Sequence, residues 1–177
     1  MSLPLRDREG ESIGSYSVSM VEFKKVIVPH EIKALCDFDR RAFHRHPQDL
    51  FDPEDWELFE SYWVIADGHV VGCTVLLHDV DYTEEPRPGC LYIVSTGVLP
   101  EFQQKGFGTQ QKAWQIQYAK NHNFTTIVTN MRASNQEIVR VNEKFGFTVR
   151  GTDPDYYVDG EPCVVMELDL RRAQDLQ

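Results

Sequence analysis

The stretch Gln103-Gln104-Lys105-Gly106-Phe107-Gly108-Thr109 lies between an apolar run typical of a strand and a run with helical spacing. Its two glycines let the backbone approach a ligand, and free N–H groups at a helix start carry partial positive charge. The stretch therefore favours an anion site, to which Lys105 adds a cation. A tight strand-to-helix turn without a ligand is the alternative interpretation.

The same loop departs from two common nucleotide-binding patterns. It has Gln111 where the dinucleotide-binding fingerprint has a third glycine. It also lacks the Gly-Lys-Ser/Thr ending of a nucleoside triphosphate loop. Both departures weaken a nucleotide-binding interpretation.

The residues around the loop predict a strand, a helix and a second strand, which cover 91–94, 109–121 and 124–129. Ala113, Ile116 and Ala119 have the spacing of one buried helix face. Such a unit joins its two strands in parallel through a right-handed crossover. We therefore expect one parallel strand pair at the centre of the sheet.

The N-terminal half has an antiparallel pattern. A strand over 20–28 and helices near 32–43 and 53–59 precede a hairpin of strands 62–66 and 70–77, which Asp67-Gly68 connects. A polar loop is expected over 79–89. Together with the parallel pair, these elements predict a mixed sheet.

The C-terminal part begins with Ser134-Asn135-Gln136-Glu137, which has the form of a helix capping box. The helix is expected to end before Gly146, and two strands follow over 147–150 and 163–170. Asp159-Gly160 signals the turn between them. We expect a single domain over 20–170, a flexible arm over 1–19 and a tail over 171–177.

Composition limits the function further. The 177 residues carry a formal net charge of −10, which disfavours nucleic-acid binding and favours a cationic partner. No apolar run is long enough to cross a bilayer. We therefore expect no membrane insertion and a cytoplasmic location.

The cysteines form no C-x-x-C pair and are expected to be free thiols. His44 and His46 lack a third ligand, so no metal site is predicted.

The loop resembles the acyl-CoA motif Q/R-x-x-G-x-G/A of GNAT-family N-acetyltransferases, matched by Gln103, Gly106 and Gly108. A second block, from Asn135 to the pair Gly146-Phe147, resembles a later helix of that family. The resemblance implies a place near the pantetheine for Asn135, and a role as the cap of that helix is the alternative, compatible with the first. The resemblance implies an α/β (α+β-like) fold with a mixed, largely antiparallel sheet, a splayed parallel strand pair and about four flanking helices. It also implies acetyl-CoA as co-substrate.

The resemblance assigns two groups of site residues. The residues expected to bind the cofactor lie on a strand, the loop and the second block, and they are Thr96, Gly97, Val98, Gln103, Gln104, Lys105, Gly106, Phe107, Gly108, Thr109, Asn135 and Asn142. The candidate catalytic residues are Val98, whose amide would polarise the thioester, together with Tyr92 and Asn142. Asn142 stands where many relatives have an acidic tyrosine, and Tyr92 where some have a glutamate, so neither familiar role transfers.

Other side chains remain open as catalytic groups. The candidate bases are His78, Asp79, Asp81, Glu84 and Glu85, and the candidate donors to sulfur are Tyr156 and Tyr157. The predicted function is acetyl transfer from acetyl-CoA to a primary amine of a small molecule or peptide by direct attack. A non-catalytic acyl-CoA-binding module and a nucleotide-binding regulator are the alternatives, and homodimer formation is left open.

Overall fold

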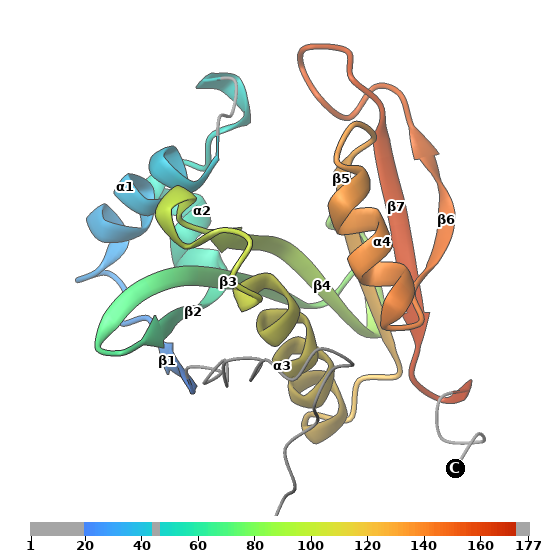
Figure 1. Cartoon of the computed structure of the whole chain (residues 1–177). Coiled ribbons are helices and arrows are strands. Elements are labelled where there is room, and N and C mark those ends of the chain that lie inside the picture. Colours follow the sequence, from blue (N-terminus) through green and yellow to red (C-terminus); the bar gives the residue numbers. More distant parts are fainter. Residues whose placement is uncertain (1–19, 44–46, 173–177) are drawn as a thin grey trace, which may run out of the picture.

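The computed structural model describes residues 20–43 and 47–172. Its strands are β1 (Val21–Lys25), β2 (Glu60–Ala66), β3 (His69–Val80), β4 (Pro86–Val98), β5 (Thr126–Arg132), β6 (Thr148–Asp153) and β7 (Cys163–Asp169). Its α-helices are α1 (Ile32–Ala42), α2 (Pro53–Leu58), α3 (Phe107–Asn121) and α4 (Gln136–Lys144), and short 3-10 helices cover Pro47–Asp49 and Pro100–Phe102 (Figure 1). The expected arm, most of the tail, and His44 and His46 lie outside the described residues.

The seven strands form one sheet in the order β1-β2-β3-β4-β5-β7-β6. β4 and β5 are parallel, paired from Cys90↔Thr126 to Ile93↔Thr129, whereas the other neighbouring pairs are antiparallel. The structure therefore confirms the mixed, largely antiparallel sheet with one parallel pair.

A β-bulge on β4 coincides with the point where the parallel strands separate. Ile93 pairs with Leu76 and Ser95 with Val75 of β3, which leaves Val94 as the extra residue. A bulge bends its strand and increases its twist. Because Ile93 is also the last β4 residue paired with β5, β4 continues along β3 while β5 continues along β7. The bend opens a gap in the middle of the sheet.

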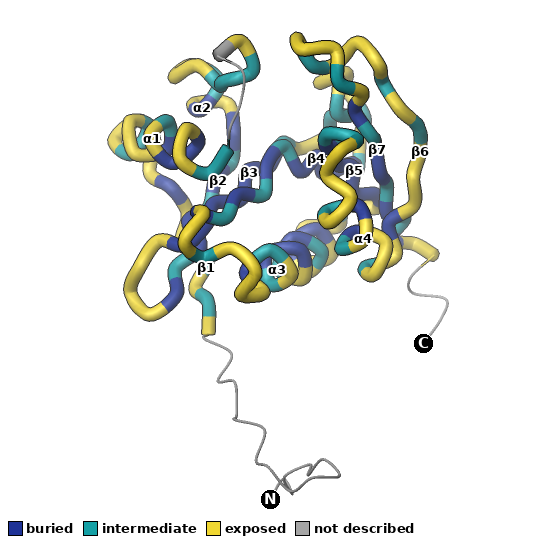
Figure 2. The backbone as a smooth tube through the Cα atoms, turned by 45° about the horizontal axis from the view of Figure 1, so that its top comes forward, coloured by how far each residue is buried: buried dark blue, intermediate teal, exposed yellow. Residues whose placement is uncertain are grey.

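Helices pack against both faces of the sheet. Successive residues of a strand point to opposite faces, so each strand provides apolar side chains to both helical layers. Leu91 and Ile93 pack with α3 and α4 on one face. Cys73 and Val75 pack with α1 and α2 on the other, where Trp56 and Trp63 are also buried. Figure 2 shows these buried strands at the centre and exposed residues along the outer helices.

Three sequence predictions are corrected. The expected loop over 79–89 is shorter, since β3 and β4 pair as far as Val80↔Pro86. Ladder hydrogen bonds between backbones hold these polar residues in strands. The capping box headed by Ser134 does not form, because the Ser134 hydroxyl donates to Glu161. Asn135 is the cap of α4, as its alternative role predicted, and accepts a hydrogen bond from Ile138 N at 3.3 Å.

The third correction concerns the buried side of α3. Ala113 is exposed, and the buried residues of this helix include Gln111, Lys112 and Gln115. Gln111 Nε2 donates to the Gly97 carbonyl at 2.9 Å, and Gln115 Nε2 donates to Thr96 Oγ1 at 2.8 Å. These hydrogen bonds offset the cost of burying the two amides. The buried side of α3 is thus the side whose glutamines form hydrogen bonds with β4. The spacing of apolar residues in the sequence does not indicate these bonds.

Two further expectations concern cysteines and membranes. The four cysteines are free thiols, as predicted, and Cys73, Cys90 and Cys163 are buried. Within the part of the chain that the structure describes, no helix has the length and apolar character that a bilayer crossing requires.

Candidate active site

A cleft of about 680 Å³ occupies the gap between β4 and β5. Its walls come from Tyr92 and residues 94–96 of β4, residues 129–132 of β5, the start of α3, α4, residues 48–51 and two tyrosines after β6. The lining includes Asn142 from the α4 face of the sheet and Tyr92, which packs on the opposite face. The cleft therefore passes through the sheet.

The glycine loop ends at one mouth of the cleft. Gly106, the N-cap of α3, has a φ of 85°, a conformation that favours glycine. A Cβ at Gly106 or Gly108 would meet no atom within 4 Å, so both positions are open on the side where a ligand would approach. The first N–H groups of α3 have no carbonyl partner within the helix. Gly108 is among the lining residues.

Two side chains of the loop form hydrogen bonds with the protein backbone and do not extend into the cleft. Gln103 Nε2 donates to the Val98 carbonyl at 3.1 Å, and Lys105 Nζ donates to the Glu101 carbonyl at 3.1 Å. The first contact ties the loop to the end of β4, and the second ties it to the 3-10 helix Pro100–Phe102. Gln104, which has a positive φ of 61°, and Thr109 also lie at this turn, while the Phe107 ring is buried in the core.

The three predicted β4 residues have different positions. Thr96 lines the cleft. Gly97 lies under α1, where an added Cβ would come within 2.8 Å of Phe38 Cε1. Val98 pairs with Gly72 of β3 and is not among the described lining residues. Of these three, only Thr96 therefore contributes to the wall.

Asn142 from α4 and Lys112 from α3 line the inner part of the cleft, hereafter called the floor. Asn142 is fully buried, with its Nδ2 at 3.6 Å from Met131 Sδ and 3.7 Å from Met166 Sδ, while its Oδ1 has no hydrogen-bond partner. Lys112 is 4% exposed, and its Nζ lies 5.1 Å from the centre of the Phe147 ring. Burial lowers the pKa of Lys112 to about 7.

Sequence reasoning missed Lys112 as a site residue. A signal was available, because Lys112 follows Gly108 by four residues and so lies on the same helix face, one turn further along. Asn135, which the sequence did predict, lines the cleft from the start of α4.

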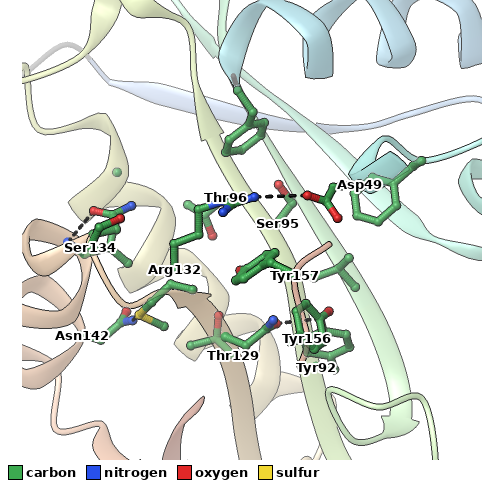
Figure 3. A pocket seen from close by; sticks show the side chains of 18 of the residues that line it. Asp49, Tyr92, Ser95, Thr96, Thr129, Arg132, Ser134, Asn142, Tyr156 and Tyr157 are labelled. Atoms are coloured by element: carbon green, nitrogen blue, oxygen red, sulfur yellow. Dashed lines mark hydrogen bonds and ion pairs between the residues drawn. The ribbon is translucent and has the colours of Figure 1, made fainter. Parts of the chain in front are cut away.

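Three tyrosines line the other end of the cleft (Figure 3). The Tyr92 hydroxyl donates to Asn130 Oδ1 at 2.7 Å and lies 3.4 Å from the Tyr156 hydroxyl. Burial raises the pKa of Tyr92 well above its usual value of 10, and the neighbouring Tyr156 adds to that shift. Tyr92 is therefore protonated at neutral pH and is available there as a hydrogen-bond donor.

Arg132 connects three segments around this end, and sequence reasoning missed it as well. Its guanidinium forms ion pairs with Asp49 at 3.1 Å, Asp159 at 2.7 Å and Glu161 at 2.9 Å. It also lies 4.1 Å from the centre of the Tyr157 ring. One positive charge thus faces three carboxylates, so the cluster keeps an excess of negative charge, which favours a cationic acceptor.

The other candidate bases lie away from the cleft. Asp79 Oδ1 accepts a hydrogen bond from Gly89 N, and Asp81 forms ion pairs with Arg87 and Arg150. His78 Nε2 lies 3.0 Å from the Tyr118 hydroxyl. None of these, nor Glu84 or Glu85, is among the described lining residues, whereas both Tyr156 and Tyr157 are.

Comparison with known proteins decides the family. Residues 31–147 match the family model described as Acetyltransferase (GNAT) family. The chain belongs to this family. It is an acyltransferase, and the resemblance seen in the sequence is confirmed together with its fold.

Individual GNAT relatives agree over most of the chain. The Probable N-acetyltransferase san of Drosophila melanogaster is 29% identical over 150 residues, covering 83% of this chain and 80% of that protein. N-alpha-acetyltransferase 50 of Danio rerio is 26% identical over 138 residues, covering 77% and 80%. The crystal structure of a Bacillus subtilis acetyltransferase in complex with CoA superimposes with a TM-score of 0.67 at 22% identity, covering 86% and 99%. The last comparison supports the fold.

Proposed function

We propose that the protein transfers an acetyl group from acetyl-CoA to a primary amine of a small molecule or a peptide by direct attack. The observation that carries this proposal is the cleft through the sheet, whose lining includes Gly108 of the glycine loop and the three tyrosines. A donor and an acceptor entering from opposite faces would meet in the gap between β4 and β5. Direct attack requires such a meeting and needs no covalent enzyme intermediate.

The residues present fit CoA. The open glycines and the start of α3 suit a diphosphate, because backbone N–H groups and the positive helix end both favour anions. β4 has no β5 partner beyond Ile93, so its edge can pair with the amides of an extended pantetheine arm. When bound, acetyl-CoA supplies the activated acetyl group. The known CoA complex of the Bacillus subtilis structural neighbour agrees with this fit.

The acceptor end suits an amine on a partly apolar body, and the three carboxylates around Arg132 also suit a cationic amine. Tyr92, Tyr156 and Tyr157 offer aromatic surface and hydroxyl groups, and Asp49 offers a carboxylate already paired with Arg132. The names of two relatives, an N-acetyltransferase and an N-alpha-acetyltransferase, support an amine acceptor. We assign polarisation of the thioester carbonyl to a backbone N–H of β4 beyond the bulge, with Val98 the candidate that the resemblance named.

The test is release of free CoA from acetyl-CoA with a panel of polyamines, amino acids, aminoglycosides and peptides with free N-termini, alongside calorimetric binding of CoA. Turnover with one acceptor class supports the proposal and names the acceptor. CoA binding without turnover on any of them favours the non-catalytic module. Absence of CoA binding contradicts the proposal.

A further inference from the structure

Lys112 is a buried amine that has no acidic partner. It is 4% exposed, and within residues 20–43 and 47–172 no hydrogen bond or ion pair reaches its Nζ. The contact that its Nζ makes is with the face of the Phe147 ring, at 5.1 Å from the centre. A buried ammonium is costly unless a polar or anionic group meets it. Lys112 lines the cleft, so water or a bound ligand in the cleft can supply such a group.

Asn142 marks the same part of the cleft. It bonds Phe147 through the backbone, since Phe147 N donates to the Asn142 carbonyl at 3.1 Å. Its side-chain Oδ1 is buried without a partner. Both residues line the cleft, and both contact Phe147, Lys112 through its Nζ and Asn142 through its backbone carbonyl, so they belong to the same part of its wall. The Asn142 Oδ1 can accept a hydrogen bond from a water or a ligand in the cleft.

The position of Lys112 along α3 sets what it can reach. It follows Gly108 by four residues, about 6 Å along the helix axis. If the loop at Gly108 holds the diphosphate, Lys112 lies deeper, beside the path of the arm that carries the sulfur. The remaining charged or titratable side chains that line the cleft are Asp49, Tyr92, Arg132, Tyr156 and Tyr157. These five residues lie at the end of the cleft that holds Arg132 and the tyrosines. On the floor, the side chain that can give a proton to the sulfur is therefore Lys112.

We propose that Lys112 is the catalytic acid that protonates the CoA sulfur as it leaves. This inference rests on the proposed acetyl transfer. The acceptor nitrogen forms a C–N bond with the acetyl carbonyl carbon, and the C–S bond breaks with its electron pair remaining on sulfur. The Lys112 ammonium gives one proton to that sulfur, which yields free CoA thiol and a neutral Lys112 amine. Solvent then returns a proton to Lys112, and the acceptor nitrogen loses one to solvent.

The environment of Lys112 suits this role. Burial alone brings its pKa to about 7, so the group gains and loses a proton close to neutral pH. A thiolate forming in this enclosed floor would be costly without a nearby cation. Asn142, which has no ionisable proton, orients a polar atom of the ligand or holds a water. It does not replace the acid.

The experiment compares Lys112→Met with Lys120→Met, the same change at an exposed position of the same helix. With the acceptor found above, Lys112→Met is expected to lower kcat by about 100-fold or more, and Lys120→Met to leave it unchanged. The second readout needs no acceptor: the thiolate absorbance of bound CoA gives the pKa of its thiol. That pKa is expected below the free-thiol value in the wild type and at least about one unit higher in Lys112→Met.

Lys112→Arg separates charge from proton donation. Arginine keeps the cation but holds its proton too tightly to give it up, so it should retain the lowered thiol pKa without restoring kcat. If Lys112→Met retains kcat within threefold and leaves the thiol pKa unchanged, the proposal for Lys112 is overturned while the acetyl transfer stands. If the wild type binds no CoA, the acetyl transfer itself fails, and the role of Lys112 fails with it.

Discussion

The Tyr92 hydroxyl donates a hydrogen bond to Asn130 Oδ1 at 2.7 Å, joining β4 to β5 at the point where the two strands separate. Ile93↔Thr129, the last backbone pair of these strands, lies directly beside this contact. The side-chain bond thus holds the strands together on one face just before the bulge at Val94 bends β4 away. It fixes the width of the cleft where the acceptor is proposed to enter.

Tyr92→Phe tests whether this hydroxyl holds the two strands in position or accepts a proton as a general base. Because the pKa of Tyr92 is raised well above 10, the residue cannot act as a base near pH 7. We expect kcat/KM to fall by less than about tenfold, the pH profile between pH 6 and 9 to keep its shape, and unfolding free energy to fall by about 1 kcal/mol. Loss of the limb that reports the general base would instead identify Tyr92 as that base.

Gly108→Asp tests the anion site. The new side chain has room in the protein, since no atom lies within 4 Å of a Cβ there, but it brings a negative charge to the start of α3. Calorimetry should show a loss of CoA affinity of at least about 100-fold with little change in melting temperature.

The matched control is Gly151→Asp in β6, which also has no neighbour within 4 Å of an added Cβ and lies outside the cleft lining. It should leave CoA affinity unchanged. Equal affinities in Gly108→Asp and the wild type would remove the anion site from this loop.

Glu161→Ala tests the ion cluster that joins β5 to the segment before β7. Hydrogen bonds from the Ser134 hydroxyl and N–H, followed by Arg132, lower the pKa of Glu161 from 4.5 to about 2. A carboxylate with a lowered pKa in the folded state stabilises the protein above the unfolded pKa, and this contribution is lost as pH falls through the folded value.

The melting temperature of the wild type should therefore exceed that of Glu161→Ala above pH 4.5, and the two should converge as pH approaches about 2. Ser134→Ala, which removes the hydroxyl and keeps the N–H, should give an intermediate difference. A gap that stays constant from pH 6 to pH 2 would show that Glu161 acts through packing alone.

The sequence predicted the order of strands and helices because local signals agree with the fold. Asp67-Gly68 connects β2 to β3, and Gly146 ends α4 with a φ of 89°. Competition between side chains for hydrogen-bond partners was harder to predict. Ser134 has the right spacing for a cap, but Glu161, distant in sequence, accepts its hydroxyl hydrogen bond in the folded chain. Such long-range pairing is not contained in a local pattern.

The sequence predicted several residues that line the cleft, among them Gly108, Asn135, Asn142 and the three tyrosines, but Lys112 and Arg132 were missed. Gly108 and Asn135 belong to local motifs, and both line the cleft. Arg132 was missed because its partners, Asp49 and Glu161, lie far from it in sequence. Lys112 was missed because apolar periodicity assigns a lysine to the solvent side of a helix.

Lys112→Met should make the protein more stable while making it a poorer catalyst. The folded-state pKa of about 7 lies below the 10.5 of the unfolded chain, so the unfolded wild type binds more protons between these values. Wild-type stability therefore rises with pH across that window. Below pH 7 the buried ammonium costs on the order of 5 kcal/mol, since a pKa difference of one corresponds to about 1.4 kcal/mol.

Methionine of similar length removes that cost, so urea unfolding should show Lys112→Met more stable than the wild type at pH 6, with the difference shrinking as pH rises toward 10. Lys120→Met, on the exposed side of α3, should show neither effect. If Lys112→Met is instead less stable at pH 6, the amine is a structural group with a favourable partner. A stabilising variant with reduced kcat would show that the buried charge is maintained for activity at the expense of stability.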